Sequence, residues 1–181
     1  MEIQTTDIDG LLLVRPRLFE DQRGEFSETW NQRAFDEAVG HPVRFVQANE
    51  SRSNKGVLRG LHFQSPPYAQ GKLVRVVHGS VLDVAVDLRK DSKTYGDHHC
   101  AVLSEDNRWQ FWIPPGFAHG FLTLQEDTKF HYLCTDFYRA DAEGCLKWND
   151  PDLAIEWGVK SVNVSEKDKA APPFFTFVSP F

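Results

Sequence analysis

The chain has 181 residues, of which 41% are hydrophobic and 25% are charged, the balance of an ordinary globular protein with a real core. The formal net charge of -6 disfavours a nucleic-acid surface, and no apolar stretch is long enough to span a membrane. The start, MEIQTTDIDG, has neither the basic nor the apolar region of a targeting signal, and the three cysteines form no CxxC pair, so we expect a cytoplasmic protein with reduced thiols.

Alternating apolar and polar residues, interrupted by turn sequences such as SEDN and QEDT, predict a protein built mainly of strands. Breaks at this spacing are typical of a β-sandwich or a β-barrel. In chain order, the expected strands cover residues 11–19, 24–30, 42–51, 72–77, 81–88, 99–104, 108–114, 120–124 and 129–138.

Two of these strands, residues 72–77 and 81–88, predict a β-hairpin because only the sequence His78-Gly79-Ser80 separates them. Period two sorts the side chains of the second strand onto two faces. One face carries Leu82, Val84, Val86 and Leu88, and the other carries Asp83, Ala85 and Asp87.

Helix is expected at only two places. The sequence NQRAFDEAVG has Asn31 as a possible N-cap and Gly40 as a C-terminal stop. The sequence SEKDKAA could begin a second helix, since Ser165 and Asp168 have the spacing of a capping box. The aromatic, proline-containing tail APPFFTFVSPF is expected to pack on the barrel.

The stretch GVLRGLHFQ, residues 56–64, places an arginine and a histidine three positions apart in an otherwise apolar run. Strand residues at that spacing point to opposite faces, so Arg59 and His62 share a pocket only if the backbone is irregular between them. Gly60 could supply that irregularity as a bulge. The alternative is a regular strand with a solvated arginine and a core histidine.

Three more segments bring polar side chains toward the expected interior. Lys72 shares its strand face with two valines, an uncommon environment for an ammonium group. The turn PPGFAHGF, residues 114–121, would deliver His119 to the start of a strand, although a lone histidine in a turn is often structural. Tyr132 and Tyr138 have the same parity, so both phenols could enter one cavity, or both could simply pack as aromatics.

The PxGxxH turn is a cupin-like signature and raises the question of a metal. Metal-binding cupins carry an HxH pair, a carboxylate seven residues before a glycine, and the histidine of PxGxxH. Here the pair is His62-Phe63-Gln64, and Lys72 lies seven residues before Gly79. An amide is a poor ligand and an ammonium repels a divalent cation, so we expect no metal. The remaining imidazole, ammonium, guanidinium and phenol suit proton transfer next to a carbonyl.

With their flanking sequence, these segments closely resemble the dTDP-4-dehydrorhamnose 3,5-epimerase family, a metal-independent branch of the cupins. The resemblance implies an all-β, cupin-type jelly-roll barrel with a few short helices, in which residues 1–181 form a single domain. Its motifs are FEDQRGEFSETW (19–30), FVQANESRSNKGVLRGLHFQ (45–64), GKLVRVVHGSVLDVAVDLRK (71–90), WIPPGFAHGF (112–121), YLCTDFY (132–138), KWNDPDLAIEW (147–157) and SEKD (165–168).

The resemblance also implies catalytic roles. His62 resembles the general base, tuned by Asp168, and Tyr132 resembles the general acid on the opposite face of the sugar. Lys72 would stabilise the enolate oxygen at C4, so that no cofactor is required. The residues alone leave Asp168 open between this dyad and a helix cap, and the resemblance favours the dyad.

Substrate contacts follow from the same resemblance. Arg59 and His119 would orient the sugar and bind the diphosphate. The family implies a homodimer with exchanged N-terminal strands, so that some contacts come from the partner chain. The further contacts implied are Phe19, Arg23, Glu28, Gln47, Asn49 and Tyr138.

The leading hypothesis is an epimerase that inverts C3 and C5 of dTDP-4-dehydro-6-deoxy-D-glucose to give dTDP-4-dehydro-L-rhamnose. One alternative is a single-centre epimerase or ketoisomerase of a related deoxysugar pathway, and another is a non-catalytic cupin that binds sugar nucleotides. Binding alone needs no acid and base on opposite faces, so the presence of His62, Lys72 and Tyr132 together favours an enzyme.

Overall fold

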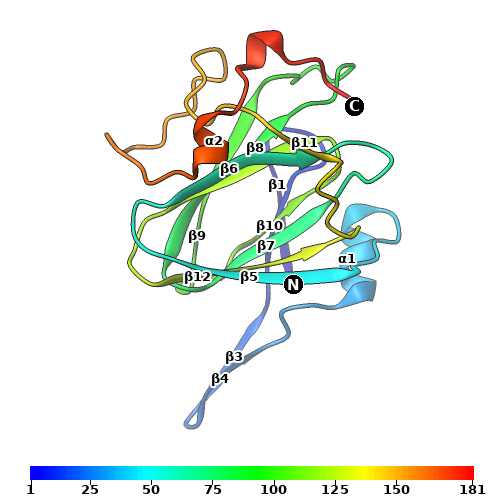
Figure 1. Cartoon of the computed structure of the whole chain (residues 1–181). Coiled ribbons are helices and arrows are strands. Elements are labelled where there is room, and N and C mark those ends of the chain that lie inside the picture. Colours follow the sequence, from blue (N-terminus) through cyan, green and yellow to red (C-terminus); the bar gives the residue numbers. More distant parts are fainter.

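The computed structural model describes residues 1–181 and shows two antiparallel sheets that face each other as the walls of a jelly-roll barrel (Figure 1). The predicted all-β class is therefore confirmed. The six-stranded sheet has the order β1 (Glu2–Thr5), β2 (Leu12–Arg15), β10 (Gln110–Ile113), β7 (Lys72–His78), β12 (Thr128–Cys134) and β5 (Gln47–Ser53). The five-stranded sheet has the order β13 (Glu143–Cys145), β6 (Leu58–Gln64), β11 (Phe117–Thr123), β8 (Ser80–Asp87) and β9 (His98–Ser104).

A two-stranded ribbon leaves the barrel near the N-terminus. It pairs β3 (Leu18–Asp21) with β4 (Gly24–Ser27), and Figure 1 shows it projecting well away from both sheets. The predicted strand 11–19 is thus divided at Pro16, whose missing N–H suits a break between pairing partners. We call residues 18–27 the arm.

Other strand boundaries also differ from the prediction. The predicted strand 42–51 begins only at Gln47, because Val43 and Phe45 pack with Trp112 in an apolar cluster instead of joining a ladder. The sequence did not predict β1 and β13, whose four and three residues are too short for a clear periodic signal.

The predicted hairpin over residues 72–88 is wrong. β7 pairs with β10 and β12, whereas β8 pairs with β11 and β9 in the opposite sheet. Gly79 makes the crossing with a φ of +82°, at a point where a Cβ atom would lie 2.5 Å from Oγ1 of Thr128. A short glycine turn can connect two strands of one hairpin or two strands in different sheets. The local sequence is the same in both cases, and only the tertiary pairing of the strands distinguishes them.

The two predicted faces of β8 are both buried. Val84, Val86 and Leu88 face away from the barrel interior and pack with Leu146 and Trp157 of the C-terminal half. The opposite face, which carries Asp83 and Ala85, points into the barrel. The C-terminal residues therefore form an outer layer over the five-stranded sheet, as Figure 1 shows for the orange and red segments.

Helices are short and lie where the capping signals predicted them. α1 (Gln32–Val39) starts at Asn31, whose side chain accepts a hydrogen bond from the N–H of Ala34, and it stops at Gly40 with a φ of +84°. α2 (Glu166–Lys169) starts at the N-cap Ser165. A 3-10 turn, η1 (Phe174–Thr176), follows in the tail.

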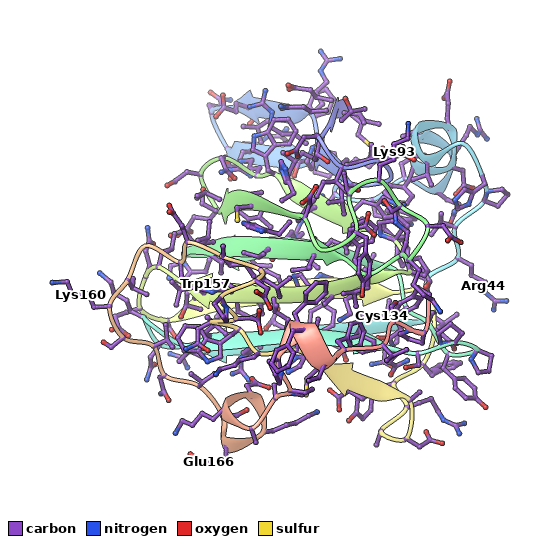
Figure 2. The ribbon with its side chains drawn as sticks, turned by 90° about the horizontal axis from the view of Figure 1, so that it is seen from above. Arg44, Lys93, Cys134, Trp157, Lys160 and Glu166 are labelled. Carbon is purple, nitrogen blue, oxygen red and sulfur yellow. The ribbon has the colours of Figure 1, made fainter.

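The predicted packing of the aromatic tail is confirmed. The rings of Phe177 and Phe181 lie 5.5 and 6.0 Å from the ring of Phe63 on β6. The view from above in Figure 2 shows side chains filling the space between and around the sheets, with Arg44, Lys160 and Glu166 at the periphery. No helix is both long and apolar enough to cross a membrane.

Candidate active site

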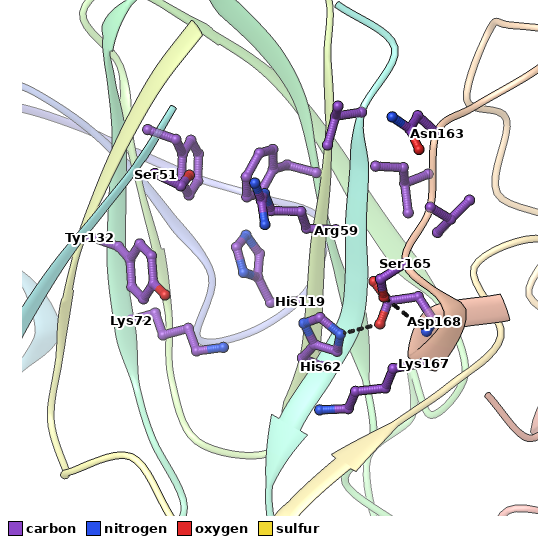
Figure 3. A pocket seen from close by; sticks show the side chains of 15 residues that line it. Ser51, Arg59, His62, Lys72, His119, Tyr132, Asn163, Ser165, Lys167 and Asp168 are labelled. Atoms are coloured by element: carbon purple, nitrogen blue, oxygen red, sulfur yellow. Dashed lines mark hydrogen bonds and ion pairs between the residues drawn. The ribbon is translucent and has the colours of Figure 1, made fainter. Parts of the chain in front are cut away.

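A cavity of about 500 Å³ opens between the two sheets, beside α2. Its polar lining comes from segments that are distant in the sequence, and Figure 3 shows these side chains converging on one space. Phe121 and Phe130, whose rings stack at 4.0 Å, form an apolar part of the wall. The polar lining includes Ser51, Arg59, His62, Lys72, His119, Tyr132, Lys167 and Asp168.

His62 and Asp168 form a pair across the edge of the cavity. Nε2 of His62 lies 2.6 Å from Oδ1 of Asp168, whose side chain is only 4% exposed. Burial alone would raise the pKa of Asp168, but hydrogen bonds from His62 and from the N–H of Gly60 hold this pKa below its ordinary value. A carboxylate that stays ionised here stabilises the positive charge that His62 would acquire as a base.

The structure also shows how Asp168 relates to the helix cap. Oγ of Ser165 accepts a hydrogen bond of 3.1 Å from the backbone N–H of Asp168, as in half of a capping box. The carboxylate of Asp168 points away from the helix start and binds His62 and Gly60 instead. Asp168 therefore takes part in both arrangements, the cap through its backbone and the dyad through its side chain.

Arg59 and His62 line the same cavity, as predicted. The register between β6 and β11 shifts between the pairs His62–His119 and Arg59–Phe121, and Gly60 has a φ of +140°. A Cβ atom on Gly60 would lie 2.5 Å from Cα of Gly120, so glycine is required for the two strands to approach this closely. The expected irregularity at Gly60 is confirmed, and the interpretation of Arg59 as an outward-facing residue is excluded.

Arg59 and His119 differ in burial. The Arg59 side chain is exposed at the cavity mouth and donates to Oγ of Ser53, with Nη2 at 3.1 Å. His119 is buried, and its Nε2 lies 2.9 and 3.0 Å from the two carboxylate oxygens of Asp83. The sequence analysis missed Asp83 as a site residue, although an aspartate in the middle of an apolar strand that faces the interior was a usable signal.

Lys72 and Tyr132 lie on the wall opposite the His62–Asp168 pair (Figure 3). Burial lowers the pKa of Lys72, an effect that neighbouring Asp83 and Glu143 oppose, and Lys72 forms no salt bridge. Burial raises the pKa of Tyr132, so its phenol stays protonated at neutral pH. Lys72, which has no salt-bridge partner, and the neutral phenol of Tyr132 therefore face the imidazole of His62 across the cavity.

A smaller pocket of about 260 Å³ adjoins the cavity and shares His62, Lys72 and Tyr132 with it. Polar contacts shape this pocket: Nε2 of Gln47 donates to Asn49 at 3.0 Å, and Oε1 of Gln47 accepts from the N–H of Tyr138 at 2.9 Å. The hydroxyl of Tyr138 donates to Glu143, which also pairs with Lys167. The structure thus brings Gln47, Asn49 and Tyr138 next to the reactive groups, and adds Glu143 and Lys167, which the sequence analysis did not single out.

Three of the predicted contacts lie away from this cavity. Phe19 and Arg23 are on the arm, where Phe19 packs on Phe26 and Arg23 binds Asp21. Glu28 follows the arm and accepts a hydrogen bond from Asn31. Within one chain, therefore, the arm residues do not reach the groups that they were predicted to assist.

Gln64, which stands where metal-binding cupins have their second histidine, hydrogen-bonds to the backbone instead. Oε1 of Gln64 accepts from the N–H of Arg139 at 2.7 Å, and its Nε2 donates to the carbonyl of Tyr68. No group of three or more His, Cys, Asp or Glu side chains in residues 1–181 is arranged to hold a metal ion. Metal independence stays a prediction for experiment.

A half-buried imidazole paired with a buried carboxylate faces an ammonium and a phenol inside a jelly-roll barrel, which defines an acid–base enzyme of cupin-type fold. The family model described as dTDP-4-dehydrorhamnose 3,5-epimerase matches residues 5–175. The chain belongs to this family, and the resemblance found in the sequence is confirmed.

Individual relatives support the assignment over nearly the full length. The chain is 53% identical over 168 residues to a dTDP-4-dehydrorhamnose 3,5-epimerase of Pseudomonas aeruginosa, covering 92% of each chain. A crystal structure of the enzyme from Elizabethkingia anophelis has a TM-score of 0.94 at 45% identity, covering 97% of both chains. An epimerase of Legionella pneumophila in complex with dTDP-4-keto-L-rhamnose also has a TM-score of 0.94, at 46% identity, covering 98% of this chain and 94% of that one.

Proposed function

We propose that this protein inverts C3 and C5 of dTDP-4-dehydro-6-deoxy-D-glucose and so produces dTDP-4-dehydro-L-rhamnose. The observation that carries the proposal is the placement of the His62–Asp168 pair and of Tyr132 on opposite walls of one cavity, with Lys72 beside Tyr132. Inversion requires a base on one face of the sugar and a proton donor on the other, and this arrangement supplies both.

The ketone at C4 makes the protons on C3 and C5 removable, because the electron pair left on carbon delocalises onto the C4 oxygen. His62 takes the proton, and the ionised Asp168 stabilises the resulting imidazolium. Lys72 stabilises the enolate oxygen where negative charge develops. Tyr132 then donates its proton to the same carbon from the opposite face, and the ketone re-forms with inverted configuration.

The remaining site residues bind and orient the substrate in this proposal. Arg59 and His119 orient the sugar and bind the diphosphate, as guanidinium and imidazole donors suit phosphate oxygens. The smaller pocket, with Gln47, Asn49 and Tyr138, receives the nucleotide side of the ligand because it adjoins the reactive groups and is lined by polar and aromatic side chains.

A homodimer completes the site. Phe19 is 49% exposed and Phe26 is 68% exposed on an arm that contacts little of its own barrel, and exposed strand edges invite pairing with another chain. Exchange of arms between two copies would carry Phe19, Arg23 and Glu28 to the partner's cavity. Light scattering that finds a fully active monomer at micromolar concentration would contradict this assembly.

Two further proposals concern the whole chain. Residues 1–181 act as one cupin-like domain, because the C-terminal layer shares an apolar cluster with the barrel, and a single cooperative unfolding transition is expected.

The protein works in the cytoplasm, because Cys100, Cys134 and Cys145 are unpaired thiols. Cell fractionation that finds the chain outside the cytoplasm would contradict the second proposal.

The deciding experiment is incubation with the 4-keto sugar nucleotide in deuterated water containing a chelator, followed by NMR of the sugar. Deuterium at both C3 and C5 supports the proposal, and deuterium at one centre supports a single-centre epimerase. Absence of exchange, with binding retained, supports a non-catalytic binder. Loss of exchange only when the chelator is present, with recovery on metal addition, would contradict metal independence.

A further inference from the structure

One hydroxyl in the cavity has no hydrogen-bonding partner. Oγ of Ser51 is the one buried side-chain oxygen or nitrogen in residues 1–181 without a partner, and Ser51 lines the cavity together with His62, Lys72 and Tyr132. A buried hydroxyl without a partner is unfavourable, and native structures rarely keep one without a use.

Ser51 belongs to a row of four polar side chains on β5. Gln47, Asn49, Ser51 and Ser53 alternate with exposed residues and share the inward face of this strand. The other three already have partners: Gln47 binds Asn49, Asn49 also contacts the thiol of Cys134, and Ser53 accepts from Arg59. Only Ser51 is left for a ligand to satisfy.

The position of Ser51 places it at the sugar. β12 aligns Phe130 with Ser51 and Tyr132 with Asn49, so Ser51 sits one step beyond the proposed acid, on the same wall (Figure 3). Its neighbours on that part of the wall include the apolar Phe130 and Phe121, which cannot bind a hydroxyl. The smaller pocket that we assign to the nucleotide includes Gln47 and Asn49 but does not include Ser51.

We propose that Ser51 hydrogen-bonds the C2 hydroxyl of the hexose and selects substrates that carry it. Inversion moves the C3 hydroxyl and the C5 methyl from one side of the ring to the other, whereas the C2 hydroxyl keeps its configuration. A hydroxyl fixed in the wall can therefore hold C2 through both inversions. A site that hydrogen-bonds a substrate hydroxyl discriminates against the analogue that lacks it.

This proposal rests on the proposed function, and Ser51→Ala tests it with two 4-keto substrates that differ only in the C2 hydroxyl. The wild type should use the 2-deoxy analogue about tenfold less efficiently in kcat/KM, the effect of one hydrogen bond of ordinary strength. The variant should lose about tenfold on the normal substrate and less than about threefold on the analogue, so that its preference falls from about tenfold to less than about threefold.

Ser53→Ala is the matched control, since Ser53 is the next inward serine on β5 and its hydroxyl is taken by Arg59. It is expected to lower kcat/KM for both substrates by the same factor and to keep the preference for the C2 hydroxyl. Ser51→Ala should also raise the melting temperature of the ligand-free protein by about 2–4 °C, because the unpartnered hydroxyl is gone. A loss of stability instead would mean that Ser51 is structural and would overturn the proposal.

Binding measurements separate this proposal from the proposed function. dTDP-glucose has the C2 hydroxyl but no ketone, so its affinity can be measured by calorimetry whether or not the protein is an epimerase. Ser51→Ala should weaken dTDP-glucose about tenfold and leave dTDP unchanged. Equal weakening of dTDP would make Ser51 a phosphate contact and overturn the proposal, as would unchanged affinity for both ligands. An absence of exchange in wild type would overturn only the proposed function.

Discussion

The wall built from β6, β11 and α2 and the projecting arm are two contrasting regions of this molecule. In the wall, His62 and His119 are already bound to buried carboxylates, and two glycines fix the approach of the strands. On the arm, Phe19 and Arg23 are exposed and contact only other arm residues or their immediate neighbours. One chain thus holds both histidine–carboxylate pairs without help from another chain. The arm residues have no such site within their own chain, and under the proposed exchange of arms they would complete nucleotide recognition on a second chain.

The largest effect is expected from His62→Asn, which removes the proposed base and leaves the rest of the wall in place. Deuterium exchange at C3 and C5 should fall by about 10⁴-fold, while dTDP affinity stays within a small factor, because the lost interaction belongs to the transition state. His78→Asn, at an exposed histidine paired with Glu105, is the control and should exchange normally. Exchange at the wild-type rate in His62→Asn would show that His62 does not take part in proton transfer.

Tyr132→Phe should separate the two halves of the reaction. His62 can still remove a proton and return a deuteron to the same face, so exchange should persist while formation of the inverted product falls by about 10³-fold. NMR of one sample measures both quantities. Tyr95→Phe, at a tyrosine that packs on Phe174 away from the cavity, should change neither. Equal loss of exchange and inversion would show that Tyr132 does not act as the opposite-face acid.

Lys72 should set the alkaline limit of the reaction. Burial lowers the pKa of Lys72 from the ordinary 10.5 and raises that of Tyr132 from 10.0, so the ammonium loses its proton earlier than an exposed lysine would. Since the proposed role of Lys72 in stabilising the enolate requires the charged form, kcat should fall as pH rises through this lowered pKa. Lys72→Met should reduce kcat by about 10²-fold and remove that alkaline limb from the pH profile. An unchanged limb in Lys72→Met would assign it to another group.

The same contrast explains what the sequence could predict. The caps of α1, the irregularity at Gly60 and the meeting of His62 with Asp168 each follow from a local rule or from the family motifs, and the structure contains all three. The pairing partners of β7 and β8 depend on contacts distant in the chain, so the same glycine turn wrongly predicted a hairpin. Serine occurs in every environment, and its type alone could not have marked Ser51 as unpartnered.

The smallest effect is expected from the arm. Arg23→Ala removes a cation that, in an exchanged dimer, would meet the nucleotide bound to the partner chain. The affinity for dTDP should fall by about tenfold, the value of one charge-assisted hydrogen bond, and kcat at saturation should not change. Arg52→Ala, at an exposed arginine paired with Asp127, is the control and should bind dTDP normally.

Mixing variants tests whether the arm serves its own chain or the partner. His62→Asn chains keep Arg23 on the arm but lack His62 in the cavity. Arg23→Ala chains keep His62 but lack Arg23. If arms are exchanged, each mixed dimer contains one site with both an intact His62 and an intact Arg23, so equimolar mixing should restore turnover at substrate concentrations too low for Arg23→Ala alone. If each arm serves its own chain, no site in the mixture is complete, and turnover at low substrate should stay at the level of the Arg23→Ala chains present. That outcome would contradict the exchange of arms, because the catalytic residues and the arm that serves them would then belong to the same chain.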